Sequence, residues 1–297
     1  MSQKLPKIIA VAGPTASGKS TLALALARRF KGEIINADSR QVYRGMDIAT
    51  DKLISKEVPH HCFDLVDPDQ NFSVAEYKLA AETAIAAALN RGCLPILVGG
   101  TGLYLKALVE NLSLPAVPPD PELRTILESL TTLELLARLE KFDPETARQI
   151  DRKNRRRLVR ALEVVLKTGW SFKKSSAVKP RKFQVLTLAP KVEFSDLETR
   201  WKNRIQTQIA EGLIEETEKL RLAYDPALPS MSSLGYSEMG KYLAGELSLD
   251  EAKELLLIHT RQYAKRQLTW FKRVKEIQWV ADQAEAAVLT EDFLKNV

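Results

Sequence analysis

The stretch GPTASGKS, residues 13–20, constrains the fold of this chain more than any other part of its sequence. It matches the pattern G-x-x-x-x-G-K-[ST], in which glycines let backbone N–H groups surround phosphate oxygens and a lysine adds a positive charge. The apolar run at 7–12 predicts a buried strand before the loop, and residues 19–30 predict a helix that points its positive N-terminus at the phosphate. The pattern predicts phosphate binding, with Mg²⁺ at Ser20, but does not identify the phosphate.

Apolar runs alternate with helical patterns along much of the chain, which is typical of a parallel α/β sheet. We expect further strands at 33–37, 94–98 and 183–189, and a helix at 74–91. Ligands of such sheets bind beyond the carboxyl ends of the strands. The phosphate loop, Asp38-Ser39 and the GGTG turn at 99–102 should therefore meet at one edge of the sheet.

The composition changes at LSLPAVPPDP, residues 112–121, where four prolines cannot continue a helix. From there to about 172 the pattern is helical, without a strand. We therefore expect an α/β fold with a P-loop NTPase-like core and a parallel sheet, interrupted by an all-helical insertion domain. The core occupies 1–114 and 179–297, and the insertion occupies 115–178. In the second part of the core we expect an amphipathic helix at about 194–222, a loop with Gly235, and a helix at about 248–274.

The chain has 297 residues, of which 45% are hydrophobic, enough for a sizeable core. We expect no signal peptide, and no apolar stretch approaches the roughly 20 residues of a membrane span. The two cysteines, Cys62 and Cys93, and the three histidines have no zinc-ligand spacing. We expect a cytoplasmic protein that does not contact membranes. Nothing in the pattern indicates an obligate assembly, so we expect a monomer.

Basic residues are concentrated in two runs of this chain, whose net charge is +6. RQIDRKNRRRLVR spans 148–160, and RQYAKRQLTWFKRVK spans 261–275 with aromatic residues among the cations and no acid. Either run alone is typical of a solvated helix face. Two such runs beside a phosphate loop favour a nucleic-acid partner, whose backbone binds cations and whose unstacked bases bind aromatic side chains.

Six segments, in this order, resemble the tRNA dimethylallyltransferases, also called tRNA isopentenyltransferases. They are GPTASGKS (13–20), ADSRQVYRGMDIAT (37–50), GGTGLYLKAL (99–108), NRRRLVRALEV (154–164), SLGYSEM (233–239) and RQYAKRQLTWF (261–271). The resemblance implies that the loop binds the diphosphate of dimethylallyl diphosphate, not ATP. It also implies transfer of the five-carbon group to N6 of the adenine immediately 3′ of the anticodon in tRNA.

The resemblance further implies catalytic roles for three residues. Asp38 resembles the general base, Thr101 resembles a diphosphate contact near the bridging oxygen, and Arg204 matches an arginine that grips the diphosphate. It also implies that the loop holds the diphosphate with Mg²⁺ at Ser20; the loop residues are Gly13, Pro14, Thr15, Ala16, Ser17, Gly18, Lys19 and Ser20. The chain departs from the family pattern at Arg40, Ala49 and Glu198.

The tRNA contacts implied by the resemblance lie in four segments. They are Ser39, Arg40 and Gln41; Arg124; Arg156, Arg157 and Arg160; and Gly235, Tyr236, Gln262, Lys265, Arg266 and Trp270, with Gln267 on the same basic helix. An ordinary core position is the alternative for Tyr236 and for Trp270.

Three other functions remain open at this point. An adenylate isopentenyltransferase would prenylate free AMP or ATP, but it would not need the two basic runs. A P-loop small-molecule kinase would leave GGTGLYLKAL and RQYAKRQLTWF unexplained. An RNA-binding module without catalysis would not need Asp38, Thr101, Lys19 and Ser20.

Overall fold

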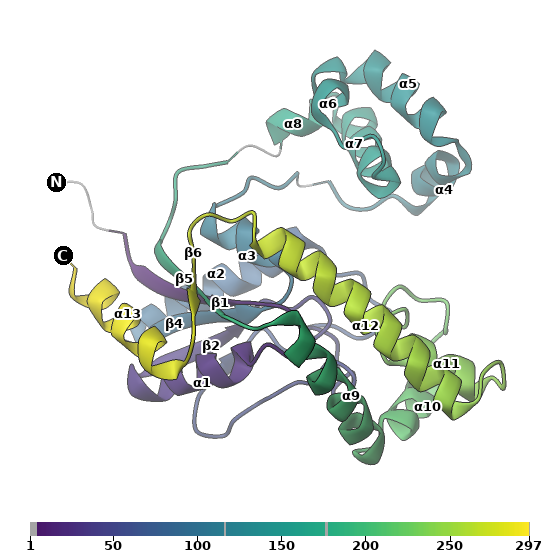
Figure 1. The fold of residues 1–297 in the computed structure, drawn as a ribbon. Helices are drawn as coiled ribbons and strands as arrows, with labels where there is room; N and C mark the ends of the chain where they lie inside the picture. The colour runs from purple at the N-terminus through teal and green to yellow at the C-terminus, as the bar shows by residue number, and fades with distance from the viewer. Residues whose placement is uncertain (1–4, 116, 176–177, 297) are drawn as a thin grey trace. The chain divides into compact units, whose positions relative to one another are not determined.

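The computed structural model describes residues 5–115, 117–175 and 178–296 (Figure 1). Contacts between Cα atoms divide the chain into two compact units. We call the first, made of the chain up to Val109 and from Lys182 onward, the core unit; the second, Glu110–Arg181, is the insertion unit. Within the described residues, no helix combines the length and the apolar character that crossing a membrane requires.

The core unit is built on a parallel sheet with the strand order β3-β2-β4-β1-β5-β6. The strands are β1 (Lys7–Ala12), β2 (Gly32–Asn36), β3 (His60–His61), β4 (Leu94–Gly99), β5 (Gln184–Pro190) and β6 (Ile277–Val280). The central strand β1 pairs with β4 on one side and β5 on the other, so that Ile9 lies opposite both Ile96 and Leu186. Strands buried on both faces need continuous apolar runs, which explains the pattern seen in β1 and β4.

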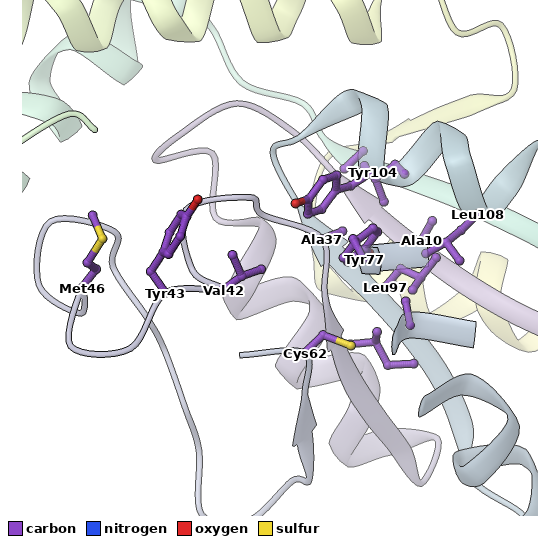
Figure 2. Packing of buried hydrophobic residues seen from close by; sticks show 14 of the residues in the cluster. Ala10, Ala37, Val42, Tyr43, Met46, Cys62, Tyr77, Leu97, Tyr104 and Leu108 are labelled. Atoms are coloured by element: carbon purple, nitrogen blue, oxygen red, sulfur yellow. The ribbon is translucent and has the colours of Figure 1, made fainter. Parts of the chain in front are cut away.

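Helices cover both faces of this sheet (Figure 1). On one face, Ile8, Ala10 and Ala12 join a cluster with α2 (Val74–Asn90), α3 (Gly102–Val109), α11 (Tyr236–Leu243) and α12 (Leu249–Phe271). Figure 2 shows part of this cluster, where Tyr77 and Tyr104 lie close together near Ala10 and Leu97. On the other face, Ile9 and Val11 pack with α1 (Lys19–Arg29) and α13 (Gln283–Lys295). The alternation follows from side chains of a strand pointing to opposite faces in turn.

The expected strands and the helices at 19–30, 74–91 and 248–274 are present, with ends shifted by a few residues. The single helix expected at 194–222 was wrong: α9 (Phe194–Ala210) and α10 (Leu213–Ala223) are separate. Gly212 lies between them with φ 100°, a left-handed conformation that glycine adopts without steric cost. The sequence also did not indicate β3, β6, α11 or α13.

The insertion unit consists of five helices in its described residues: α4 (Pro121–Ser129), α5 (Thr132–Phe142), α6 (Pro144–Gln149), α7 (Arg155–Thr168) and α8 (Phe172–Ser175). Four of them begin at a side-chain cap, from Asp120, Thr131, Asp143 and Asn154, that accepts a backbone N–H of the first turn. The unit has a core of its own, which includes Leu127, Leu135, Leu139, Leu158 and Leu162.

The two connecting segments of the insertion unit are held together at what we call the neck. Asn111 Nδ2 donates to the carbonyl of Pro180 at 2.6 Å, and Lys179 N donates to the carbonyl of Asn111 at 3.2 Å. Leu112 and Val178 form an antiparallel bridge next to them. These contacts explain why the compact unit, 110–181, is slightly longer than the 115–178 expected from the sequence.

Candidate active site

A cavity of about 510 Å³ lies in the core unit, beyond the carboxyl ends of β1, β2 and β4. Segments that are distant in sequence line it together, among them residues 49–51, Arg204 of α9 and the loop before α11. Its lining includes Thr15, Lys19 and Ser20 of the loop, Asp38–Gln41, Gly100–Leu103, and Tyr263, Arg266, Gln267 and Trp270 of α12. The cavity therefore lies at the edge of the sheet where the sequence predicts ligand binding.

The loop between β1 and α1 leaves backbone donors available at the start of the helix. Gly18 is the residue before α1, has φ 86° and provides no side-chain cap. The first N–H groups of a helix have no partner within the helix, so an uncapped N-terminus beside a cavity suits an anion. Two side chains of α9 hold the loop from outside: Trp201 Nε1 donates to the carbonyl of Thr15 at 3.2 Å, and Arg200 donates to the carbonyl of Ala16 at 3.3 Å.

Gln267 of α12 connects the phosphate loop to the GGTG turn. Its Oε1 accepts the backbone N–H of Thr15 at 2.9 Å, and its Nε2 donates to the carbonyl of Gly100 at 2.9 Å. A Cβ on Gly100 would come within 2.2 Å of Nε2, so glycine is what allows this side chain to pass. Sequence reasoning placed Gln267 on the basic helix but gave it no role in the site, because its two partners are 252 and 167 residues away.

Two cations face the cavity from different elements. Burial lowers the pKa of Lys19, and the neighbouring Arg204 lowers it further, while Asp38 and Asp51 act in the opposite direction. Arg204 Nη1 donates to Thr15 Oγ1 at 3.2 Å, and Arg204 Nη2 lies 2.9 Å from Asp51 Oδ2. A partly buried ammonium next to a guanidinium favours an anion between them, which supports a phosphate ligand at this end of the cavity.

Asp38 follows β2 in a turn that its neighbours hold. The side chain of Asn36, which is fully buried, accepts the N–H of Asp38 at 2.8 Å and donates to the carbonyls of Asp38 and Cys62, both at 3.0 Å. Asp38 Oδ1 accepts the N–H of Arg40 at 2.9 Å. Within the described part of the chain, Oδ2 makes no hydrogen bond, so this oxygen is free to accept a proton from a ligand.

Thr101 is joined directly to the residue after Asp38. Its Oγ1 accepts the N–H of Ser39 at 2.9 Å and donates to Ser39 Oγ at 3.2 Å. The turn beneath it is tight, since a Cβ on Gly99 would lie 2.1 Å from the carbonyl oxygen of Ala37. Tyr263 of α12 lies beside Thr101, and burial raises the pKa of its hydroxyl. Thr101 and Asp38 are thus fixed relative to each other by the loops that carry them.

The loop that continues from Asp38 to Lys52 is held by residues that sequence reasoning missed. Glu216 of α10 accepts the N–H groups of Asp47 at 3.2 Å and Ile48 at 3.0 Å, and Gln208 of α9 donates to the carbonyl of Ile48 at 2.8 Å. Within the loop, Gln41 Nε2 donates to the carbonyl of Thr50 at 2.9 Å. No local pattern marks Gln208 or Glu216, because their partner Ile48 lies 160 and 168 residues away, respectively.

The side-chain contact expected for Tyr236 is corrected by the structure. Its side chain is 1% exposed, belongs to the core cluster of α2, α3, α11 and α12, and donates to Glu216 at 2.5 Å. A side chain so deeply buried cannot touch an external RNA. Gly235 before it does line the cavity, and its N–H is held by Glu238, which in turn bonds His259 of α12.

The tRNA contacts expected on α12 are divided between the cavity and the surface. Gln262 and Lys265 are exposed and do not line the cavity, whereas Arg266 and Trp270 do. Trp270 is 40% exposed and rests on Gly102, where a Cβ would lie 2.2 Å from its Nε1. Trp270 is therefore a half-exposed aromatic at the wall of the cavity, not a core residue.

In the insertion unit, two of the four expected arginines have an internal partner. Glu163 is fully buried, and both Arg124 and Arg160 bond its carboxylate, Arg124 in a two-point pair at 2.9 Å. Burial opposes the charge on Glu163, but Arg124, the N–H of Asp120 and Arg160 together lower the pKa of this carboxyl. Arg156 and Arg157 are exposed, and in the described residues they have no acidic partner. Of the four expected arginines, only these two are left without an acidic partner among the described residues.

Comparison with known proteins assigns a family to this architecture. The sequence matches the IPP transferase family over residues 41–274. It is 46% identical over 286 residues to a tRNA dimethylallyltransferase from Geobacter sulfurreducens. This alignment covers 92% of this chain and 91% of that protein. It is 44% identical to a tRNA dimethylallyltransferase from Moorella thermoacetica, over 94% of this chain and 90% of that one.

Solved structures also resemble the fold of this chain over nearly its whole length. A full-length tRNA isopentenylpyrophosphate transferase from Bacillus halodurans has a TM-score of 0.70 at 38% identity, covering 97% of this chain and 95% of that one. A eukaryotic dimethylallyltransferase acting on tRNA has a TM-score of 0.86 at 28% identity, covering 98% and 80%. Because these similarities extend over nearly the whole chain, and with it over every segment that lines the cavity, the chain belongs to the IPP transferase family.

Proposed function

We propose that this protein transfers the dimethylallyl group of dimethylallyl diphosphate to N6 of the adenine immediately 3′ of the anticodon in tRNA. The products are N6-(dimethylallyl)adenosine in the tRNA and diphosphate. The observation that carries the proposal is that one cavity holds a phosphate loop, the free carboxylate oxygen of Asp38 and the hydroxyl of Thr101. The names of the relatives, at about 45% identity, support the same activity.

The chemistry requires two kinds of group, and the cavity contains both. The N6 amine is a weak nucleophile because its lone pair is delocalised into the ring, so a base must accept its proton as it attacks C1 of the allyl group. Asp38 is the group we assign to this step. The C1–O bond breaks with its electron pair going to the diphosphate, whose growing charge needs cations and N–H donors. We assign that role to Lys19, Arg204 and the loop amides, with Thr101 near the bridging oxygen.

Ser20 fits a magnesium ion in this scheme. Its side chain lines the cavity beside Lys19, and its hydroxyl makes no hydrogen bond within the described residues. Magnesium prefers oxygen ligands and is commonly held by one or two protein groups together with substrate phosphates and water. When bound, the ion would neutralise charge on the diphosphate. The described residues contain no cluster of acidic, histidine or cysteine side chains that would form a protein-only cage.

The base must leave its stack to reach Asp38, as bases do in other enzymes that modify them. We propose that Ser39 and Gln41, next to Asp38, contact the adenine and its neighbour, and that Arg40, Gly235 and Arg266 contact the anticodon loop at the cavity wall. The exposed cations of the two basic runs, including Arg156, Arg157 and Lys265, would contact phosphates, with Gln262 beside them. Arg124 and Arg160 shape the insertion unit through Glu163. We also propose that the protein acts in the cytoplasm as a monomer.

A transfer assay tests this function. Labelled dimethylallyl diphosphate and Mg²⁺ are incubated with an unmodified tRNA that carries adenine 3′ of its anticodon, and in parallel with AMP or ATP. We expect label on tRNA alone. Label on AMP or ATP alone would instead indicate an adenylate isopentenyltransferase. If no acceptor is labelled, the alternative of a P-loop kinase would be favoured.

Variants of the site sharpen the assay. We expect Asp38→Asn to lose transfer by about 10²–10⁴-fold, as removal of a general base does, while it retains diphosphate binding. Asp69→Asn is a matched control, because Asp69 is exposed and lies outside the cavity lining. Equal transfer by Asp38→Asn and Asp69→Asn would contradict the role given to Asp38.

A further inference from the structure

Asp51 is an acidic side chain at the anion end of the cavity, which is an unexpected place for a negative charge. It lines the same cavity as Lys19 and Arg204, and its Oδ2 lies 2.9 Å from Arg204 Nη2. Its backbone is fixed in a left-handed conformation, with φ 56°; its N–H donates to the carbonyl of Ile48, and its carbonyl accepts from Gln41 Nε2, both at 3.1 Å. The loop therefore holds Asp51 against Arg204.

Arg204 has one partner on each side of its guanidinium. One nitrogen donates to Thr15 Oγ1 in the phosphate loop, and the other pairs with Asp51. The Arg204 side chain is 22% exposed, whereas the Asp51 side chain is 57% exposed. Arg204 is thus anchored between the loop and the carboxylate. The carboxylate of Asp51 is exposed, so it can leave Arg204 and be hydrated by solvent instead.

A diphosphate in the loop and the carboxylate of Asp51 need the same cation. The guanidinium fork forms its strongest pairs with planar or tetrahedral oxyanions, and a carboxylate and a phosphate use the same donors. Two anions that share one cation also repel each other. Binding of the diphosphate must therefore break the Asp51–Arg204 pair or place a like charge beside it, and either event weakens binding.

We propose that Asp51 is an affinity-determining residue, an internal carboxylate that occupies Arg204 in the substrate-free enzyme and competes with the diphosphate for it. This inference rests on the proposed function, since it takes the loop ligand to be a diphosphate. It has a consequence for turnover. The diphosphate left after transfer stays in the loop until it dissociates, and the return of Asp51 to Arg204 lowers its affinity at that stage.

Calorimetric titration with inorganic diphosphate, at fixed Mg²⁺ and without tRNA, tests the proposal. Four proteins are compared: wild type, Asp51→Asn, which keeps the size but removes the charge, Asp51→Glu, which keeps the charge, and Asp69→Asn, which removes an equal charge outside the cavity. We expect Asp51→Asn to bind about three- to tenfold more tightly than wild type, in line with the strength of partly exposed ion pairs. Asp51→Glu and Asp69→Asn should bind like wild type.

The direction of the effect separates the proposal from a structural role. A distorted loop would weaken binding, so tighter binding cannot come from damage to the fold. Weaker binding by Asp51→Asn would mean that Asp51 orients Arg204 or ligates the cation, and equal binding would mean that the pair is incidental; both results overturn the proposal. Absence of diphosphate binding in all four proteins, including wild type, would overturn the proposed function as well.

The transfer assay gives a second readout. We expect Asp51→Asn to have a lower KM for dimethylallyl diphosphate, without a rise in kcat, because the lost competition favours the bound product as much as the bound substrate. A KM that rises in this variant would contradict the competition between Asp51 and the diphosphate.

Discussion

The pair of hydrogen bonds made by Gln267 sets up the sharpest test of how the site is built. Replacing Gln267 with alanine leaves the N–H of Thr15 and the carbonyl of Gly100 without their partner, in a place where the side chain is only 6% exposed. Each lost buried hydrogen bond costs about 1–1.5 kcal/mol, and the groups left unsatisfied add to this unless water from the cavity replaces the amide. We expect the free energy of unfolding to fall by about 2–4 kcal/mol in total.

The same substitution should also weaken ligand binding. The loop would lose its tie to the GGTG turn, so it would have to be ordered by the ligand instead. We expect diphosphate affinity to fall by roughly tenfold for this reason. Gly100→Ala should displace the Gln267 side chain, because the added Cβ would lie 2.2 Å from Gln267 Nε2. We therefore expect this variant to lose both stability and diphosphate affinity in the same way.

Urea denaturation and diphosphate titration measure the two effects. Gln262→Ala is the matched control for stability, since Gln262 has the same side chain on the same helix but is exposed and, in the described residues, makes no side-chain hydrogen bond. If the unfolding free energies of Gln267→Ala and Gln262→Ala differ by less than about 0.5 kcal/mol, the size of an ordinary surface substitution, the two hydrogen bonds of Gln267 do not hold the site together.

Three further expectations follow from other parts of the structure. Hydrogen bonds from Arg91 lower the pKa of the buried Glu33 from 4.5 to about 2. The ionised carboxylate therefore stabilises the fold above pH 4.5, by about 3 kcal/mol at most, and this stabilisation is lost as the pH falls toward 2. Denaturation of wild type and Glu33→Gln across that pH range should show the difference between their free energies of unfolding shrink as the pH falls. Burial lowers the pKa of Lys19, and the negative charge of a bound diphosphate should raise it, so affinity should decrease as the pH rises through the pKa of Lys19 in the ligand-free enzyme, with proton uptake in that range that calorimetry in different buffers detects and that Lys19→Met abolishes. Gly102→Ala should displace the Trp270 indole, seen as a change in tryptophan fluorescence that Trp270→Phe abolishes, while diphosphate binding is unchanged.

Elements with a contiguous sequence signal were predictable. The strand at 7–12, the loop at 13–20 and the helix after it are encoded in one uninterrupted stretch, so local chemistry specifies all three. The break between α9 and α10 was not predicted, because the apolar period continues across Gly212 and a lone glycine is tolerated in helices. The strand β6 has only four residues, too few for a periodic signal.

The site divides in the same way. Lys19, Ser20, Asp38 and Thr101 lie in short motifs directly after strands, and their positions follow from the topology of a parallel sheet. Gln208, Glu216 and Gln267 support these motifs from helices far along the chain, and only the packing of α9, α10 and α12 determines which helical face meets which loop. Tyr236 shows the opposite error, since its motif suggested a ligand contact whereas its side chain serves the core.

The neck at Asn111, Leu112, Val178 and Pro180 joins the two ends of the insertion unit to each other. The hydrogen bonds and the isolated bridge bring the two connecting segments together, so the insertion unit closes as a loop whose two ends are neighbours. The number of residues beyond the neck should then have little effect on the folding of the sheet. A segment of a different length could therefore close at the same neck without altering the sheet that carries the cavity.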